Sequence, residues 1–354
     1  MTISVINIKT HEINYNNKTF KDFDKCLKYA NLIVKDASAL LSKTPQLTLS
    51  FEVRNTNADF MNCIRRALYD EISVYSMDVE LSNITTNDKY IINDGIVKNN
   101  IEMIPFQQEI TEEEIKKLSI SLNVENNTMN EITVYSGNIV ILKNSKEEDV
   151  ELYFSKQIPL FKLKSNKSIN IKDIGIIQDI SKTNYGKFCL LSKITYKILD
   201  VIPFNENKFT KVGESSLNSN PTHFAMSFKT HRNITIKNVI SKLCNILNTK
   251  FNDILTELKN IKNTDVVYFS ELIELETKGE FKMFHFKKEY WTIVNVISRY
   301  CYLELPTVPY VAASIIHPSI ENAVVTIQYT DAIGLITGAI NQFLADIKIF
   351  EKSF

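Results

Sequence analysis

The spacing of apolar residues changes within one stretch of the N-terminal half, between residues 47 and 106. Alternating apolar and polar positions predict a half-buried strand that contains Leu47, Leu49 and Phe51. Apolar residues then recur three to four positions apart, which predicts an amphipathic helix with a stripe of Phe60, Ile64, Leu68 and Ile72. Either Asn57 or Asp59 can cap this helix, and alternation resumes over residues 73–79. We therefore expect the order strand, helix, strand.

A second strand and helix are predicted after the middle of the chain. Phe224, Met226 and Phe228 alternate, and apolar residues keep helical spacing from Ile236 to Leu258. The C-terminal third repeats this order, with strands predicted over 281–286, 310–316 and 323–329, a helix around 293–299 and a final helix to Phe354. One offset of about 100 residues aligns Phe224 with Val324, Ile240 with Ile340, Leu243 with Phe343 and Leu247 with Ile347.

These patterns predict an α+β protein with two sheet-and-helix units, the first of them interrupted by an insertion. Short alternating runs separated by Asn, Ser and Gly indicate that the insertion is mostly β. Its acidic run, Glu112 to Glu114, is typical of a helix N-terminus, where the helix dipole favours negative charge. The expected domains are a helical extension over 1–44, with its helix over 19–43; the first unit over 45–108 and 203–260; the inserted domain over 109–202; and the second unit over 261–354.

Composition and charge narrow the functional class. Lys and Arg total 41, as do Asp and Glu, so the net charge is +0. Little direct DNA contact is expected, because neutralised phosphates supply most of the affinity of DNA-binding proteins. Hydrophobic residues make up 44% of the chain, which is enough for folded cores. No apolar run approaches the roughly 18 residues of a membrane span, so we expect a soluble, cytoplasmic protein.

Residues that could carry chemistry are scattered along the chain. The five cysteines form no C-x-x-C pair and have no nearby histidine at ligand spacing, which argues against structural zinc and suits a reducing compartment. The sequence also lacks a P-loop, a G-x-S-x-G motif and the clustered aspartates of a polymerase catalytic centre. No catalytic residue, metal or cofactor is predicted, and the chain is not expected to be an enzyme.

Two phrases of the first unit resemble the assembly signature of DNA-directed RNA polymerase, found in the bacterial alpha subunit, the archaeal D subunit and the third subunit of eukaryotic polymerase II. The first phrase is matched without a gap by Phe60, Asn62, Ile64, Arg65, Arg66, Leu68, Glu71, Ile72, Met77 and Asp78. The second is matched by Asp94, Ile101, Ile104 and Pro105. Where the family has His-Arg and Gly, this chain has Asn99-Asn100 and Glu102. Gly186-Lys187 resembles a Gly-Lys pair in the family's inserted domain.

The C-terminal third is similar to the small partner subunit of the same enzymes, the archaeal L subunit and the eleventh subunit of polymerase II. The similarity lies in residues 290–299 and 311–318, with Trp291, Val294 and Ser298 replacing the family's His, Gly and Arg. The chain therefore resembles the two partner subunits fused into one polypeptide. Such fusions resemble those of large cytoplasmic DNA viruses, which carry their own polymerase.

The resemblance implies a non-catalytic assembly platform, monomeric within the polymerase, on which the second-largest and the largest subunits dock. Further small polymerase subunits are additional candidate partners. Adjacent arginines on an amphipathic helix cannot both face the core, so one at least is available to pair with a partner carboxylate. The candidate partner-binding residues are Arg65, Arg66, Asn62 and Glu71, with Asn295 and Arg299 as counterparts in the second unit. The long helices are expected to pack about a pseudo-twofold axis through Ile240, Leu243, Leu247, Phe251, Ile340, Phe343 and Ile347.

A different class of function stays open at this point. A binding protein or small-molecule enzyme unrelated to transcription could share the fold. Such a protein needs a concave pocket with converging polar groups, and the sequence leaves room for one mainly in residues 107–202. A structural scaffold outside transcription is the third alternative.

Overall fold

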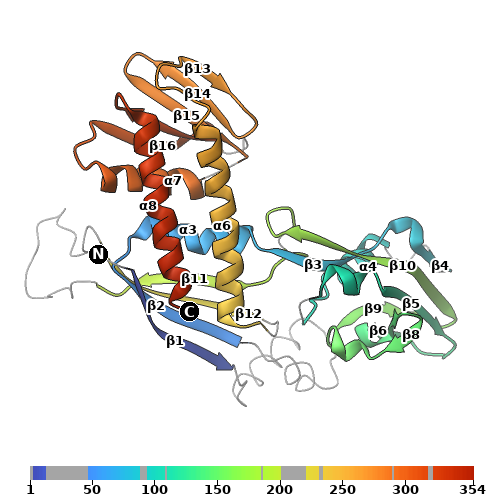
Figure 1. Ribbon diagram of the computed structural model, residues 1–354. Coiled ribbons are helices and arrows are strands. Elements are labelled where there is room, and N and C mark those ends of the chain that lie inside the picture. The colour runs from blue at the N-terminus through green and yellow to red at the C-terminus, as the bar shows by residue number, and fades with distance from the viewer. Residues whose placement is uncertain are drawn as a thin grey trace, which may run out of the picture.

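The computed structural model of the chain describes residues 3–12, 47–87, 94–107, 110–184, 186–200, 221–230, 234–288, 291–317 and 322–354. In these ranges the protein is α+β, as expected, and all of its strand pairs are antiparallel. Figure 1 shows two sheets joined by a pair of long helices, with a third, mostly β region to one side.

The first sheet is built from strands that are far apart in the sequence. Its order is β1-β2-β12-β11, from Ser4–Glu12, Leu47–Arg54, His223–Thr230 and Ser192–Ile198. Alternation turns one face inward, so that Leu49, Phe51 and Val53 are buried beside Phe224, Met226 and Phe228. Helices α3 (Ala58–Asp70) and α6 (Ile236–Leu258) follow β2 and β12 in the chain, and their buried side chains join the same core.

The C-terminal sheet has the order β13-β14-β15-β17-β16. Its strands are Val267–Phe269, Ile273–Lys278, Phe281–Lys287, Asn322–Gln328 and Tyr310–Ile315. Helix α7 (Trp291–Glu304) follows β15, and α8 (Ala332–Lys352) follows β17. Strands β15, β16 and β17 and both helices lie where the periodicity predicts them, whereas β13 and β14 were not anticipated.

The inserted region forms a sheet of its own. The sheet runs β3-β10-β5-β7-β8, with β4 also paired to β10, and the ribbon β6-β9 lies beside it. These strands are Ser73–Asp78, Lys167–Ile180, Leu118–Asn126, Ile139–Lys143, Lys146–Glu148, Ile84–Thr86, Ile132–Tyr135 and Pro159–Leu163. The region also contains α4 (Asp94–Glu102), α5 (Glu112–Ile115) and three short 3₁₀ turns. The acidic run does begin a helix, since Thr111 and Glu114 form a capping box at the start of α5.

Two separate hydrophobic cores follow from this arrangement. One, which we call the shared core, contains buried residues of the first sheet, the C-terminal sheet and helices α3, α6, α7 and α8. The other, the inserted core, contains buried residues of α4 and of the inserted strands. Helices α6 and α8 lie side by side between the first and C-terminal sheets (Figure 1). The end of α8 reaches the first sheet, where Phe350 and Phe354 pack on Phe51 with ring centroids 6.0 and 4.9 Å away.

Helix α8 is the one helix of the described ranges that is long and apolar enough to cross a membrane by length and composition alone. No such segment was expected from the sequence. Within the fold its apolar residues, among them Ala339, Phe343, Ile347 and Phe350, are fully buried in the shared core. Packing against other elements is therefore sufficient to explain the apolar composition of α8.

The domain boundaries differ from those expected at residues 108 and 202. Strand β3 pairs with β10 in the inserted sheet, and α4 packs in the inserted core. Both elements, expected in the first unit, therefore belong to the inserted region. Strand β11 pairs with β12 and belongs to the first sheet instead of the inserted domain. Periodicity identifies a strand but does not specify its partner, because pairing is decided by tertiary packing.

The N-terminal extension is not helical throughout. Residues Ser4–Glu12 form β1, which pairs with β2 at the edge of the first sheet. The helix predicted over residues 19–43 lies outside the described residues.

The alignment of the two closing strands is shifted by one residue. In the pairing of β12 with β2, Phe224 lies opposite Val53. In the pairing of β17 with β15, Ala323 lies opposite Phe286. Phe224 therefore corresponds to Ala323, not to Val324, and the buried residues of the two strands then coincide. In the helices, the proposed pairs at an offset of 100 residues are all buried. The N-caps Thr235 and Asp331, however, lie 96 positions apart. The two offsets differ by about one helical turn, so apolar spacing alone cannot distinguish them.

The cap of α3 gives a direct test of how the local sequence fixes this helix. The side chain of Asn57, and not that of Asp59, accepts a hydrogen bond of 2.9 Å from the backbone nitrogen of Phe60. Replacing Asn57 by Ala should lower the free energy of unfolding by about 1 kcal/mol, because an orphan N–H loses its acceptor. Chemical denaturation measures this change. Asn57→Ser is the control, since serine also caps helices; an equal loss in both variants would contradict the capping role.

Candidate partner-binding site

Helix α3 presents the two candidate arginines on its half-buried side. Arg65 Nε and Nη2 donate to Asn62 Oδ1, one turn earlier, at 3.1 and 2.8 Å. Both residues are partly exposed. Asn62 thus fixes the direction of the guanidinium group, while a guanidinium has five N–H donors and only two are used in this contact. Arg65 can therefore bind a partner carboxylate in a preset orientation.

Arg66 is held by the second half of the chain. Its Nε donates to Thr292 Oγ1 on α7 at 2.9 Å, so this arginine bridges α3 and α7. The sequence placed Arg65 and Arg66 together as a partner-binding pair. In the structure Arg65 bonds to a residue of its own helix, α3, whereas Arg66 bonds to a residue of α7.

A second arginine at the crossing of α3 and α7 acts through its charge. Burial raises the pKa of Asp59, and the nearby charge of Arg299 offsets part of that rise. Arg66 and Arg299 lie 233 positions apart, as do Asp59 and Thr292. The charge of Arg299 thus influences a residue of α3, just as Arg66 of α3 bonds to a residue of α7. Asp59 and Thr292 were not among the predicted site residues. The choice of Arg299 as a counterpart of the α3 arginines was the signal that could have identified them, since the spacing of 233 relates both pairs.

The remaining partner-binding candidates differ in their surroundings. Glu71, directly after α3, pairs with Lys250 on α6 at 3.0 Å, and its side chain is only 13% exposed. This ion pair ties α3 to α6 and leaves Glu71 little surface to offer another protein. Asn295 and Arg299 lie on α7 and are partly exposed.

The residues predicted to join the long helices all lie in the shared core. The set is Ile240, Leu243, Leu247 and Phe251 on α6 with Ile340, Phe343 and Ile347 on α8, and each is at most 1% exposed. The rings of Phe251 and Phe343 are in direct contact, with centroids 4.6 Å apart. Phe343 also contacts Phe60 on α3 and Tyr300 on α7, at 5.8 and 5.5 Å, so its side chain meets all three other helices.

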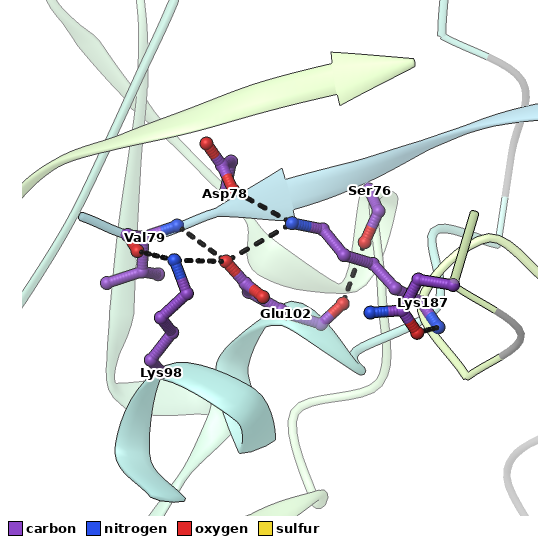
Figure 2. A network of polar contacts seen from close by, with 7 residues as sticks. Ser76, Asp78, Val79, Lys98, Glu102 and Lys187 are labelled. Atoms are coloured by element: carbon purple, nitrogen blue, oxygen red, sulfur yellow. Dashed lines mark hydrogen bonds and ion pairs between the residues drawn. The ribbon is translucent and has the colours of Figure 1, made fainter. Parts of the chain in front are cut away.

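A partly buried ionic network joins Asp78 and Lys187, which lie in stretches that resemble the polymerase family, to Glu102, which departs from the family pattern. Lys187 Nζ lies 2.8 Å from Asp78 Oδ1 and 3.2 Å from Glu102 Oε1, and its side chain is 7% exposed. Figure 2 shows Glu102 between Lys187 and Lys98. Lys98 Nζ lies 3.3 Å from Glu102 Oε1. Glu102 Oε1 also accepts from the backbone nitrogen of Val79 at 3.0 Å. The network therefore fastens the end of β3 to α4 and to the loop before β11.

The chemistry of this network is structural. The hydrogen bond from Lys187 is the main reason that the pKa of Asp78 lies below its usual value. Glu102 stands where the family has Gly, so the departure from the family pattern supplies a second carboxylate for the buried lysine. Asp78 and the Gly186-Lys187 pair were both recognised in the sequence, but their contact was not, because 109 positions separate Asp78 from Lys187.

Asp78→Asn tests the contribution of the network to stability. Because the folded pKa of Asp78 is lowered, its contribution is present above the unfolded value of about 3.8 and is lost as the pH falls through the folded pKa. At neutral pH we expect a loss of about 1 kcal/mol, reduced by the partial exposure of Asp78. Urea unfolding at neutral and acidic pH should show this difference shrinking below the unfolded pKa. Asp253→Asn, at an exposed position of α6, is the control; a loss at Asp78 that persists in acid would contradict the assignment.

Three of the cysteines in the described ranges lie in the shared core. Cys63, Cys244 and Cys301 are buried, and burial raises the pKa of the Cys244 and Cys301 thiols to about 12. Within the described ranges, no group of three or more His, Cys, Asp or Glu side chains could hold a metal ion. No protein-family model matches the chain, and no curated protein matches it.

Proposed function

We propose that this chain is a non-catalytic assembly platform of a multi-subunit DNA-directed RNA polymerase, on which the second-largest and then the largest subunit dock. The observation that carries the proposal is the position of the first signature phrase. Its gapless match covers α3 and β3, and on α3 it places Arg65, oriented by Asn62, at a partly exposed surface. A fixed arginine at a surface is the kind of residue that binds a carboxylate of another protein.

The two halves of the chain correspond to the two partner subunits of the family. The first sheet has the order β1-β2-β12-β11, and four strands of the C-terminal sheet have the order β14-β15-β17-β16. In both, the second strand precedes a shorter helix and the third precedes a long one. The equal spacing of Arg66 with Arg299 and of Asp59 with Thr292 at the crossing of α3 and α7 supports a pseudo-twofold axis between the halves.

Covalent fusion explains how such a platform assembles. Each long helix is buried against the other half, so neither half could bury its apolar surface alone. The segment between α6 and β13 is short and runs from Lys259 to Val266. A short tether gives an effective concentration of order mM, so the pairing of the halves does not depend on balanced expression of two chains.

The partners of the platform are proteins, and its place is the cytoplasm. Its net charge of +0 supports little direct contact with DNA. Nucleotidyl transfer is a property of the whole complex and not of this chain. In this proposal Arg65 and Asn62 contact the second-largest subunit, whereas Arg66 and Glu71 stabilise the platform itself.

Co-expression with the second-largest polymerase subunit of the same genome tests this function. We expect the tagged chain to retain that subunit on an affinity column, and the double variant Arg65→Ala, Arg66→Ala to retain much less. Circular dichroism of the variant checks that the chain stays folded. Undiminished retention by a folded double variant would count decisively against the proposed role of α3.

A further inference from the structure

The outer face of the first sheet carries a hollow on the side away from the helices. Its volume is about 460 Å³, and it is bordered by Lys9, Ser50, Glu52, Thr195, Lys197 and Ser227 among others. We call this hollow the trough. None of these residues belongs to the signature phrases or to the contact between α3 and α7.

Strand register explains why the face is hollow. Lys9 lies opposite Ser50, Ser50 opposite Ser227 and Ser227 opposite Thr195, so one row crosses all four strands. In the next row, Ala225 lies between Glu52 and Lys197. On the two central strands Ser50, Ala225 and Ser227 are small and Glu52 is the one long side chain of these two rows, whereas Lys9 and Lys197 lie on the two outer strands. The floor is polar, since the hydroxyls of Thr195 and Ser227 are 3.2 Å apart.

Glu52, the acidic residue that borders the trough, already has two side-chain partners. A bulge in β1 gives Asn7 a φ of 53°, and its amide donates to Glu52 Oε1 at 2.9 Å. His223 Nε2 lies 2.9 Å from the other carboxylate oxygen. The Asn7 hydrogen bond is the main cause of a lowered pKa at Glu52, which stays ionised. Within the described ranges Lys9 and Lys197 have no carboxylate partner, so two positive charges remain at the trough.

We propose that the trough binds an extended acidic peptide segment of a partner protein. The outer strands are three strand spacings apart, roughly 14 Å. An extended chain advances about 3.3 Å per residue, so carboxylates four to five residues apart reach both lysines. The serine and threonine hydroxyls of the floor can donate to the backbone carbonyls of that segment. Lys9 and Lys197 pair with its acidic side chains.

The same features disfavour two other ligands. A nucleic acid draws its affinity from many phosphate contacts, and here two lysines stand beside the fixed carboxylate of Glu52. A small molecule needs a pocket that encloses most of its surface, whereas the trough is an open depression on a sheet face. An extended peptide needs only a shallow surface with polar groups at regular intervals.

Fluorescence anisotropy with the full chain tests this site. The probes are labelled peptides of about twelve residues, alternating Glu with Ser, Gln with Ser, or Lys with Ser, and a single-stranded RNA of similar length. We expect the Glu peptide to bind best, with an affinity that falls as salt rises. The double variant Lys9→Gln, Lys197→Gln should weaken it by roughly ten-fold, because each exposed ion pair contributes up to about five-fold.

A matched variant controls for net charge. Lys146→Gln with Lys164→Gln removes two exposed lysines of the inserted region and should leave peptide affinity unchanged. Equal losses in the two double variants would overturn the proposal, as would equal binding of the Glu and Gln peptides. RNA binding stronger than that of the Glu peptide, and lost in Lys9→Gln, Lys197→Gln, would assign the trough to nucleic acid instead. Retention of the second-largest subunit should survive the trough variants, so failure here leaves the role of α3 untouched.

Discussion

Replacing Phe343 by alanine is expected to lower the free energy of unfolding by about 3–5 kcal/mol. The ring is fully buried and contacts Phe60, Phe251 and Tyr300, which belong to three different helices. Its loss leaves a cavity that α3, α6 and α7 cannot all close at once. Because the first and C-terminal sheets share one core, both should lose stability together. Hydrogen exchange followed by mass spectrometry measures this element by element.

The inserted core provides the matched comparison. Phe154 is also fully buried, but its ring contact is with Phe106, at 6.0 Å, within the inserted core. Phe154→Ala should accelerate exchange in β5, β7 and β10, whereas Phe343→Ala should accelerate it in β2, β12, β15 and β17. If Phe343→Ala loosened only the C-terminal sheet, the shared core would not be the unit that holds the two halves together.

The second large effect is expected at Arg65. Arg65→Ala should weaken binding of the second-largest polymerase subunit by about 30-fold or more, the loss typical of an arginine at the centre of an interface. The fold should be unaffected, since the hydrogen bonds of Arg65 to Asn62 stay within one helix turn. Surface plasmon resonance with the purified subunit measures the affinity, and thermal unfolding measures the stability.

Two other arginines separate binding from folding. Arg66→Ala removes the contact with Thr292 across α3 and α7, so it should lower the melting temperature more than it lowers affinity. Arg54→Ala, at an exposed position of β2, should change neither. Arg65→Lys should recover only part of the binding, because an ammonium cannot form the paired bonds of a guanidinium. A loss of affinity at Arg66 equal to that at Arg65 would contradict this division of roles.

The elements around α3 could be predicted because local periodicity and burial agree there. Alternation in Leu47–Arg54 and the helical stripe of Phe60, Ile64 and Leu68 both point to the side that the core covers. The helix ends at Asp70, and Ile72 is buried just beyond it. The choice between two caps required geometry: Asn57 lies before the first turn, whereas Asp59 lies inside it.

Pairing between distant segments could not be predicted in the same way. Strand β3 joins β10, and β11 joins β12, because side chains far along the chain complete each sheet. The same limit applies to the site. Helical spacing shows that Arg65 and Arg66 lie near the boundary of the buried face, but it does not show that α7 covers Arg66. The contact of Asp78 with Lys187 likewise depends on packing between separate elements.

The role of the chain as a polymerase platform can be tested by affinity purification of the tagged chain from its native source, with mass spectrometry of the stoichiometry. We expect two very large subunits with one copy of this chain and no separate small partner, because the C-terminal half takes that place. Elution of the chain alone or as a homo-oligomer would contradict it, and would mean that the resemblance to polymerase assembly subunits extends to the fold without the function.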